Sequence, residues 1–116
     1  MTFGKYVREV REGRRNEDRA FSVRQVAQRI GVEPAYLSKI EREQVAPPSE
    51  ETIRRLAAEL GEDCDLLLAM AGKVSTDLQE IILRRPQLFA DLLRQLKKVP
   101  DHAILRVVRE IRDGDW

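Results

Sequence analysis

The sequence is nearly devoid of cysteine and histidine, with one of each (Cys64 and His102) among 116 residues. A lone cysteine excludes an internal disulfide, and this pair cannot supply the ligands of a zinc site. No apolar run approaches roughly 18 residues, the length that spans a bilayer as a helix. Residues 1–10 also lack the apolar core of a signal peptide. We therefore expect a protein of the reducing cytoplasm, without a metal site and without a role at a membrane.

Catalytic motifs are missing as well. The sequence contains no Gly-rich phosphate loop, no GxSxG or HExxH pattern and no spaced cluster of metal ligands. Carboxylates are abundant, but they alternate with arginines along the expected helices, which is typical of solvated faces and intrahelical ion pairs. These absences predict neither an enzyme nor a cofactor.

Charge is distributed unevenly along the chain. Apolar residues make up 42% and charged residues 35%, which is too apolar for a disordered chain. The length of 116 residues suggests one domain, or one small domain with an appendage. The net charge of +1 gives little support by itself to nucleic-acid binding. Residues 1–42, however, contain ten Lys/Arg against six Asp/Glu, while residues 43–72 contain two against seven. A surface for a polyanion is therefore expected in the first part of the chain.

Residues 21–60 contain the most informative pattern. Gly31 can take the left-handed conformation that ends a first short helix, and Pro34 suits the first turn of a second. Ser22 is a natural N-cap of the first helix, with Gln25 completing a capping box. Two short helices around a tight turn form the helix-turn-helix layout, which places the second helix in the major groove of DNA. The apolar face at helical spacing comprises Val23, Val26, Ala27, Ile30, Leu37 and Ile40.

At this point the chain resembles the Cro/C1-type (XRE family) helix-turn-helix domain of bacterial and phage regulators. The resemblance covers residues 3–72, is most specific over residues 21–61, and leaves residues 73–116 unexplained. It implies an all-α fold, in which a five-helix, lambda-repressor-like DNA-binding domain presents its third helix to DNA. The residues that carry it are Ser22, Ala27, Gly31, Val32, Tyr36, Leu37, Ser38, Ile40, Glu41, Arg42, Pro48, Ser49, Glu50, Leu56 and Ala57.

The other elements of this domain follow from local signals. A first helix is expected over residues 2–12, with Phe3, Tyr6, Val7 and Val10 on its inner face. Residues 13–20 read as a charged connection that is longer than is usual in the family. The reading helix spans residues 34–42, and Ser49 caps a fourth helix over residues 50–60, which Gly61 ends. A short fifth helix begins at Asp63.

The outward positions of the reading helix are the candidates for contacts with base edges. We prefer Lys39, because a lysine donates to guanine O6 and N7; the alternative is a phosphate contact. Glu33 either accepts from a cytosine amine or only favours the helix N-terminus, and Ala35 can touch a thymine methyl group. The base-reading candidates are Glu33, Ala35, Ser38 and Lys39.

A second set of residues is expected to contact the DNA backbone, because arginines and hydroxyl groups bind phosphate oxygens. For each arginine the alternative is a solvated surface charge, and Glu17 and Asp18 could pair with the arginines of the connection. For Tyr36 the alternative is a half-buried structural role. Glu41 is expected to bond inside the domain, since phosphates would repel it. The backbone candidates are Ser22, Arg24, Arg29, Tyr36, Arg42, Arg14, Arg15 and Arg19.

Three positions depart from the family pattern. Val23 stands where the family often has a glutamine that contacts phosphate and braces the reading helix. Pro34 and Ala35 stand where hydrogen-bonding readers are common. Direct readout is therefore thinner than usual, so that either specificity rests on Lys39, Ser38 and DNA shape or affinity rests on backbone contacts.

Residues 73–116 predict three more helices, over residues 76–85 and from the prolines at 86 and 100. So many apolar residues in a short segment require a shared core. We expect a homodimer, because a small DNA reader gains affinity by engaging two half-sites; the alternative is a helical cap that only stabilises the first domain. The dimerisation candidates are Leu88, Phe89, Leu92, Leu93, Leu96, Ile104, Leu105, Val108 and Ile111.

The sequence thus favours a dimeric, sequence-specific repressor of transcription that binds double-stranded DNA, with a DNA-binding domain at residues 1–72 and a helical segment at residues 73–116. The rival interpretation is a protein-interaction module, such as an antitoxin or phage-type immunity protein, whose C-terminal segment binds a toxin or protease. Cys64 stands at a helix start, where a thiol pKa can fall. It is therefore either a redox-sensitive thiol or, as we prefer, a small filler residue.

Overall fold

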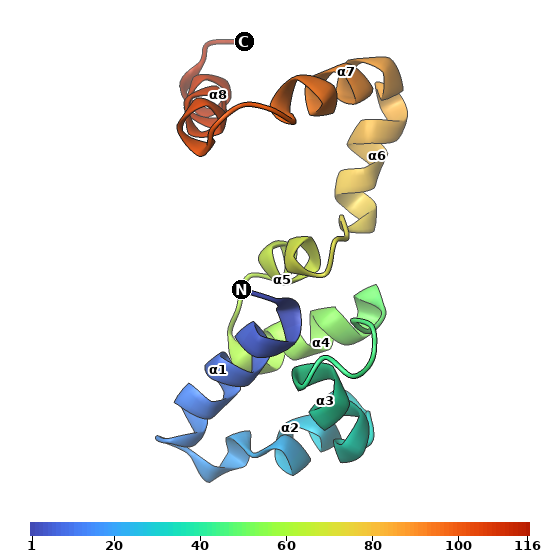
Figure 1. The fold of residues 1–116 in the computed structure, drawn as a ribbon, viewed down its shortest axis with the longest axis vertical. Helices are drawn as coiled ribbons and strands as arrows, with labels where there is room; N and C mark the ends of the chain where they lie inside the picture. The colour runs from blue at the N-terminus through green and yellow to red at the C-terminus, as the bar shows by residue number, and fades with distance from the viewer. The chain divides into compact units, whose positions relative to one another are not determined.

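The computed structural model describes residues 1–116, and all of its regular structure is helical (Figure 1). The chain divides into two compact units, Met1–Ser75 and Thr76–Trp116, so the division lies slightly beyond the expected residue 72. The predicted all-α class is confirmed, and the first unit contains the five expected α-helices. The elements are α1 (Phe3–Arg15), the 3-10 helix η1 (Arg19–Phe21), α2 (Val23–Ile30), α3 (Pro34–Glu41), α4 (Glu50–Leu60), α5 (Cys64–Met70), α6 (Thr76–Arg84), α7 (Pro86–Leu96) and α8 (Asp101–Asp113).

Helices α2 and α4 begin and end at the predicted local signals, a serine N-cap and a left-handed glycine. The Ser22 hydroxyl accepts a hydrogen bond from the Gln25 backbone N–H at 3.2 Å and caps α2. Ser49 caps α4 in the same way. Gly31 follows α2 with a φ of 77°, a left-handed conformation that glycine adopts without a Cβ penalty. Gly31 therefore permits the short turn between α2 and α3.

The core of the first unit is built around α4. In Figure 1, α2 and α3 lie on one side of α4 and α5 lies on the other. Each helix contributes the apolar face that its sequence predicts, and from α1 the side chains of Phe3 and Val7 are buried while Tyr6 and Val10 pack partly against them. The buried apolar residues are Phe3, Val7, Val26, Ala27, Ile30, Leu37, Ile40, Ile53, Leu56, Ala57, Leu60, Leu67 and Leu68.

The prediction of a connection over residues 13–20 is wrong at both ends. Helix α1 continues through Arg15, and the chain forms η1 from Arg19. Arg14 and Arg15 are good helix formers, and their charge favours the negative C-terminal end of α1. These effects outweigh the cost of Gly13, which is only about 1 kcal/mol for a glycine inside a helix. Only residues 16–18 form an open turn, and Asp18 caps η1 by accepting from the Ala20 N–H.

A buried ion pair joins α1 to α3. Arg11 Nε lies 2.7 Å from Glu41 Oε2, and Arg11 Nη2 lies 2.8 Å from Glu41 Oε1. Arg11 Nη1 also donates to the Phe21 carbonyl at 3.2 Å. The two charged side chains are only 3% and 4% exposed. The prediction that Glu41 bonds inside the domain is confirmed, and the pair fixes α3 to α1 and η1.

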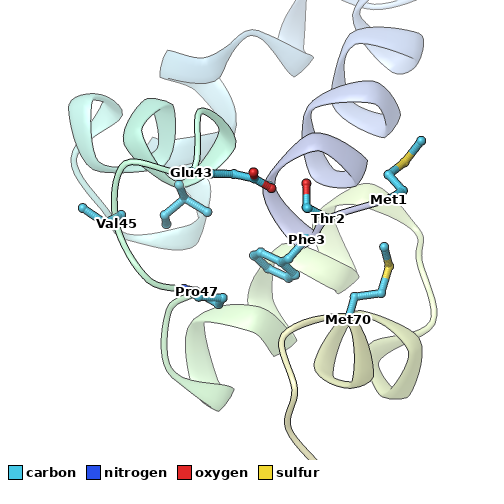
Figure 2. Close-up of a pocket in the computed structure, with 9 residues that line it drawn as sticks. Met1, Thr2, Phe3, Glu43, Val45, Pro47 and Met70 are labelled. Atoms are coloured by element: carbon cyan, nitrogen blue, oxygen red, sulfur yellow. The ribbon is translucent and has the colours of Figure 1, made fainter.

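The start of α1 lies close to the end of α3. A Cβ atom at Gly4 would collide with the Ile40 carbonyl oxygen, so only glycine permits this approach. Beside this contact is a hollow of about 430 Å³, where Figure 2 shows Phe3 between Pro47 of the α3–α4 loop and Met70 of α5. This hollow contains none of the residues that we predicted to contact DNA.

Cys64 is a packing residue at the start of α5. Its side chain is partly buried against the core. Burial raises the pKa of the Cys64 thiol, contrary to the lowering that a helix start can cause. The thiolate is therefore disfavoured, which supports the interpretation of Cys64 as a small filler and not as a reactive thiol.

The second unit consists of α6, α7 and α8, whose starts at Thr76, Pro86 and Asp101 agree with the prediction. Helix α6 packs against α7, but no residue in any of the three helices is buried. No helix of the chain combines the length and the apolar content that crossing a membrane requires. The apolar faces of this unit are therefore left largely uncovered within one copy of the chain.

Candidate nucleic-acid interface

Helix α3 has one buried side and one exposed side. Leu37, Ile40 and Glu41 point into the domain and are at most 6% exposed. Ala35 and Lys39 are exposed on the other side, with Ser38 half-buried between the two. The spacing follows the helical repeat, because residues 37, 40 and 41 share one face. The exposed side is the surface that a duplex would meet.

Tyr36 and Glu33 lie at the N-terminal end of this exposed side. Tyr36 is 36% exposed, so about a third of the residue is open to solvent. Glu33 occupies the N-cap position of α3, but its side chain makes no capping hydrogen bond. Its carboxylate is therefore not held by the helix backbone and stays available on the surface.

A hollow of about 500 Å³ borders the N-terminal end of α3. It is lined from α2 by Arg24 and Gln28 and from the turn and α3 by Val32, Glu33 and Pro34. Arg24 is exposed and makes no ion pair within the chain. An arginine in this position can reach a phosphate beside the groove that α3 would enter.

A second hollow, of about 250 Å³, borders the C-terminal end of α3. Arg42 lies at its edge and donates to the Ser38 carbonyl at 3.3 Å. Arg8, which was not among our candidates, lines the same hollow and pairs with Glu12 at 3.0 Å. That hydrogen bond to Glu12 raises the pKa of Arg8, so the guanidinium stays charged. The lining residues are Arg8, Arg11, Glu12, Arg15, Val23, Ser38, Glu41 and Arg42.

The remaining candidate arginines separate into two groups around η1. Arg14 and Arg29 stack on the Phe21 ring, with guanidinium carbons 5.5 and 5.2 Å from its centroid. Arg29 Nε also lies 2.6 Å from Glu59 Oε2. Both arginines are exposed, but their guanidinium groups are engaged with other side chains of the domain, as cation–π partners and, for Arg29, in an ion pair.

Arg15 and Arg19 form the other group. Both are exposed and neither makes an ion pair, so Glu17 and Asp18 do not pair with them. Together with Glu12 and Asn16 they line a broad hollow of about 730 Å³. The helical extension of α1, which the sequence did not reveal, is what places Arg14 and Arg15 on different sides of this helix end.

The dimerisation candidates lie on α7 and α8. Leu88, Leu93 and Ile111 are about three-fifths or more exposed (68%, 59% and 60%), and Leu105 and Val108 are about half exposed. The others are Phe89, Leu92, Leu96 and Ile104, of which none is buried. Exposed large apolar side chains in this number are typical of surfaces that bind another protein surface.

Comparisons with known proteins agree with this geometry. Residues 2–70 match the family model described as "Helix-turn-helix domain". The chain is similar to the "Uncharacterized HTH-type transcriptional regulator RghRB" of Bacillus subtilis (strain 168), with 35% identity over 79 residues, which cover 68% of this chain and 53% of that protein. The chain thus spans about half the length of this relative. No solved structure matches the chain.

Proposed function

This chain belongs to the helix-turn-helix domain family, and we propose that it is a sequence-specific DNA-binding regulator of transcription whose α3 enters the major groove. The resemblance to XRE-type regulators is confirmed for residues 2–70, which the family model matches. The observation that carries the proposal is the two-sided character of α3. Its apolar side and Glu41 are buried, while Ala35 and Lys39 are exposed between hollows that arginines line at both ends.

In this proposal the exposed side of α3 reads bases. Lys39 donates to guanine, Ser38 and Glu33 add hydrogen bonds at the base edges, and Ala35 contacts a thymine methyl group. Backbone contacts come from Ser22, Tyr36, Arg24 and Arg42, which surround α3. Arg14 and Arg29 contribute positive potential and no direct contact, because their guanidinium groups are engaged with Phe21 and Glu59.

Lys39→Ala and Arg42→Ala are expected to have different effects. Loss of a base contact at Lys39 should cost about 1–3 kcal/mol on the preferred sequence and relax the preference there. Loss of a phosphate contact at Arg42 should weaken binding to all sequences alike. It should also reduce the slope of log affinity against log salt concentration by about 1. Titrations of both variants with preferred and random duplexes measure the difference. Equal losses of both variants on both duplexes would contradict the assignment of Lys39.

We further propose that the protein acts as a homodimer that represses transcription in the cytoplasm. The exposed apolar faces of α7 and α8 support association. Two copies would present their reading helices to successive major grooves about 34 Å apart. Covering a promoter in this way most simply excludes polymerase.

The test is selection of bound duplexes from a random pool by the full chain. A sequence-specific regulator should enrich a defined motif, and a dimer should enrich a palindrome whose half-sites lie one helical turn apart. Failure to enrich any motif, while the protein still binds random DNA, would contradict sequence-specific regulation. Enrichment of a single half-site would contradict the dimer and leave the DNA reader in place.

A second candidate function is a protein-interaction module, which the uncovered apolar faces of the second unit also support. In that case α6–α8 would bind a different protein, such as a toxin or a protease, and DNA binding would be secondary. The two functions separate when α3 is changed. A partner complex that survives Lys39→Ala and Arg42→Ala, in a protein that enriches no DNA motif, would favour this module over the regulator.

A further inference from the structure

The two hollows at the C-terminal half of α1 form one continuous basic surface. Glu12 and Arg15 line both of them. One hollow extends to Arg42 beside α3, and the other extends past Asn16 to Arg19 of η1. The surface therefore starts at the reading helix and leads away from it along α1. We call Arg15, Arg19 and Arg42, which make no ion pair within the chain, the arginine strip.

The charge of this surface is strongly positive despite its carboxylates. Glu41 is neutralised by Arg11 at 2.7 Å, inside the domain. Glu12 is neutralised by Arg8 at 3.0 Å and lies 3.9 Å from Arg11. Arg15 and Arg19 therefore remain as uncompensated cations, beside the amide group of Asn16. The C-terminal end of α1 carries a partial negative charge, which the two arginines exceed.

We propose that the arginine strip binds the DNA backbone beyond the groove that α3 enters, with Arg15 and Arg19 holding phosphates that flank the half-site. This inference rests on the proposed function and extends it to a second contact region. The ligand is a phosphodiester backbone, because guanidinium groups bind phosphate oxygens in a bidentate manner and Asn16 adds a neutral donor. The effect of the strip is to lengthen the footprint without adding base contacts.

The fold explains why Arg15 and Arg19 serve this role while their neighbours do not. In the extended α1, Arg14 stacks on the Phe21 ring, whereas Arg15 makes no such contact and lines the hollow beside Asn16 and Arg19. Arg14 and Arg15 are thus adjacent in sequence and equal in charge, but they differ in what they contact. This pair provides a matched control for the proposal.

The test measures binding of the full chain to the duplex selected from the random pool, with single phosphates replaced by neutral methylphosphonates. At one or more positions flanking the half-site, wild-type affinity should fall about tenfold, the effect of losing one charge-assisted hydrogen bond. Arg15→Gln and Arg19→Gln should each reduce affinity for the unmodified duplex by about the same factor. When the phosphate that the lost arginine contacts is also replaced by a methylphosphonate, the affinity of the variant should fall little further. The slope of log affinity against log salt concentration should decrease by about 0.9 for each lost phosphate contact.

Arg14→Gln is the control. Replacement of a flanking phosphate by a methylphosphonate should reduce the affinity of this variant by the same factor as for the wild type. Thermal unfolding of each variant verifies that the fold is retained. The proposal would be contradicted if Arg14→Gln and Arg15→Gln reduced DNA affinity equally. It would also be contradicted if the losses of affinity from Arg15→Gln and from the methylphosphonate were additive at every flanking position. If no motif is enriched, the same variants are compared on a random 30-bp duplex, where a smaller salt dependence for Arg15→Gln than for Arg14→Gln supports the strip although sequence-specific regulation has failed.

Discussion

Glu41→Leu is expected to destabilise the first unit by about 3–5 kcal/mol, because it removes one partner of a buried ion pair and leaves the charge of Arg11 uncompensated. The Arg11 guanidinium makes two short hydrogen bonds to Glu41 and is 3% exposed, so water cannot replace the lost partner. Arg11→Met should destabilise the unit by a similar amount for the reciprocal reason. A loss of this size is a large fraction of the stability of a small domain.

The double variant Arg11→Met/Glu41→Leu should be more stable than either single variant, since apolar replacement of both partners removes the desolvation cost together with the attraction. Amide hydrogen exchange in α1 and α3 during urea titration measures the stability of this unit separately from the second. The control is the exposed pair Arg55–Glu51, where Glu51→Ala should cost no more than about 1 kcal/mol, since Arg55 keeps its hydrogen bond to the Ile30 carbonyl. Additive losses in the double variant would show that the pair does not act as a unit.

This ion pair also shows what sequence reasoning could not supply. Phe3, Val7 and Arg11 are spaced by four residues, so Arg11 continues the buried stripe of α1. From the sequence alone, a single arginine in such a stripe would be interpreted as exposed to solvent, because its carboxylate partner lies 30 residues away. The expectation that Glu41 bonds internally was correct, but only the packing of α1 on α3 identifies Arg11 as its partner.

The helix boundaries, in contrast, were predictable because local chemistry sets them. Ser22 and Ser49 cap their helices, Gly31 and Gly61 end them in the left-handed conformation, and Pro86 starts α7 as predicted. The connection over residues 13–20 was mispredicted because Arg14 and Arg15 extend α1 past Gly13, and because a tertiary contact adds to their local preference. The Phe21 ring provides the surface on which Arg14 and Arg29 stack, and no local signal announces it.

The candidate interface divides in the same way. That α3 would expose Ala35 and Lys39 follows from helical periodicity, and the structure agrees. That Arg29 would pair with Glu59, and that Arg8 would join the hollow beside α3, depends on the approach of helices distant in sequence. Charge counts locate a basic region but do not distinguish arginines engaged inside the domain from those available to a ligand.

Truncation after Ser75 is expected to convert a dimer into a monomer and to weaken binding to a palindromic duplex by about 10²–10⁴, the gain that linking two half-site contacts typically provides. Ser75 is the appropriate end point, since it is 4% exposed and Lys73 Nζ donates to the Pro48 carbonyl at 2.8 Å, so both belong to the first unit. Sedimentation of both chains measures the oligomeric state, and titration with the selected duplex measures affinity.

A half-site duplex separates lost dimerisation from damage to the reader, because both chains should bind it within a few-fold of each other. Leu105→Ser and Ile111→Ser should reproduce the truncation in the full chain if the apolar face of α8 forms the interface, since each is more than half exposed in one copy. Arg106→Ser, on the same helix, should leave the dimer intact. A truncated chain that still sediments as a dimer would place the interface in the first unit, and a monomeric full chain would leave the uncovered apolar faces of α7 and α8 to a different partner protein.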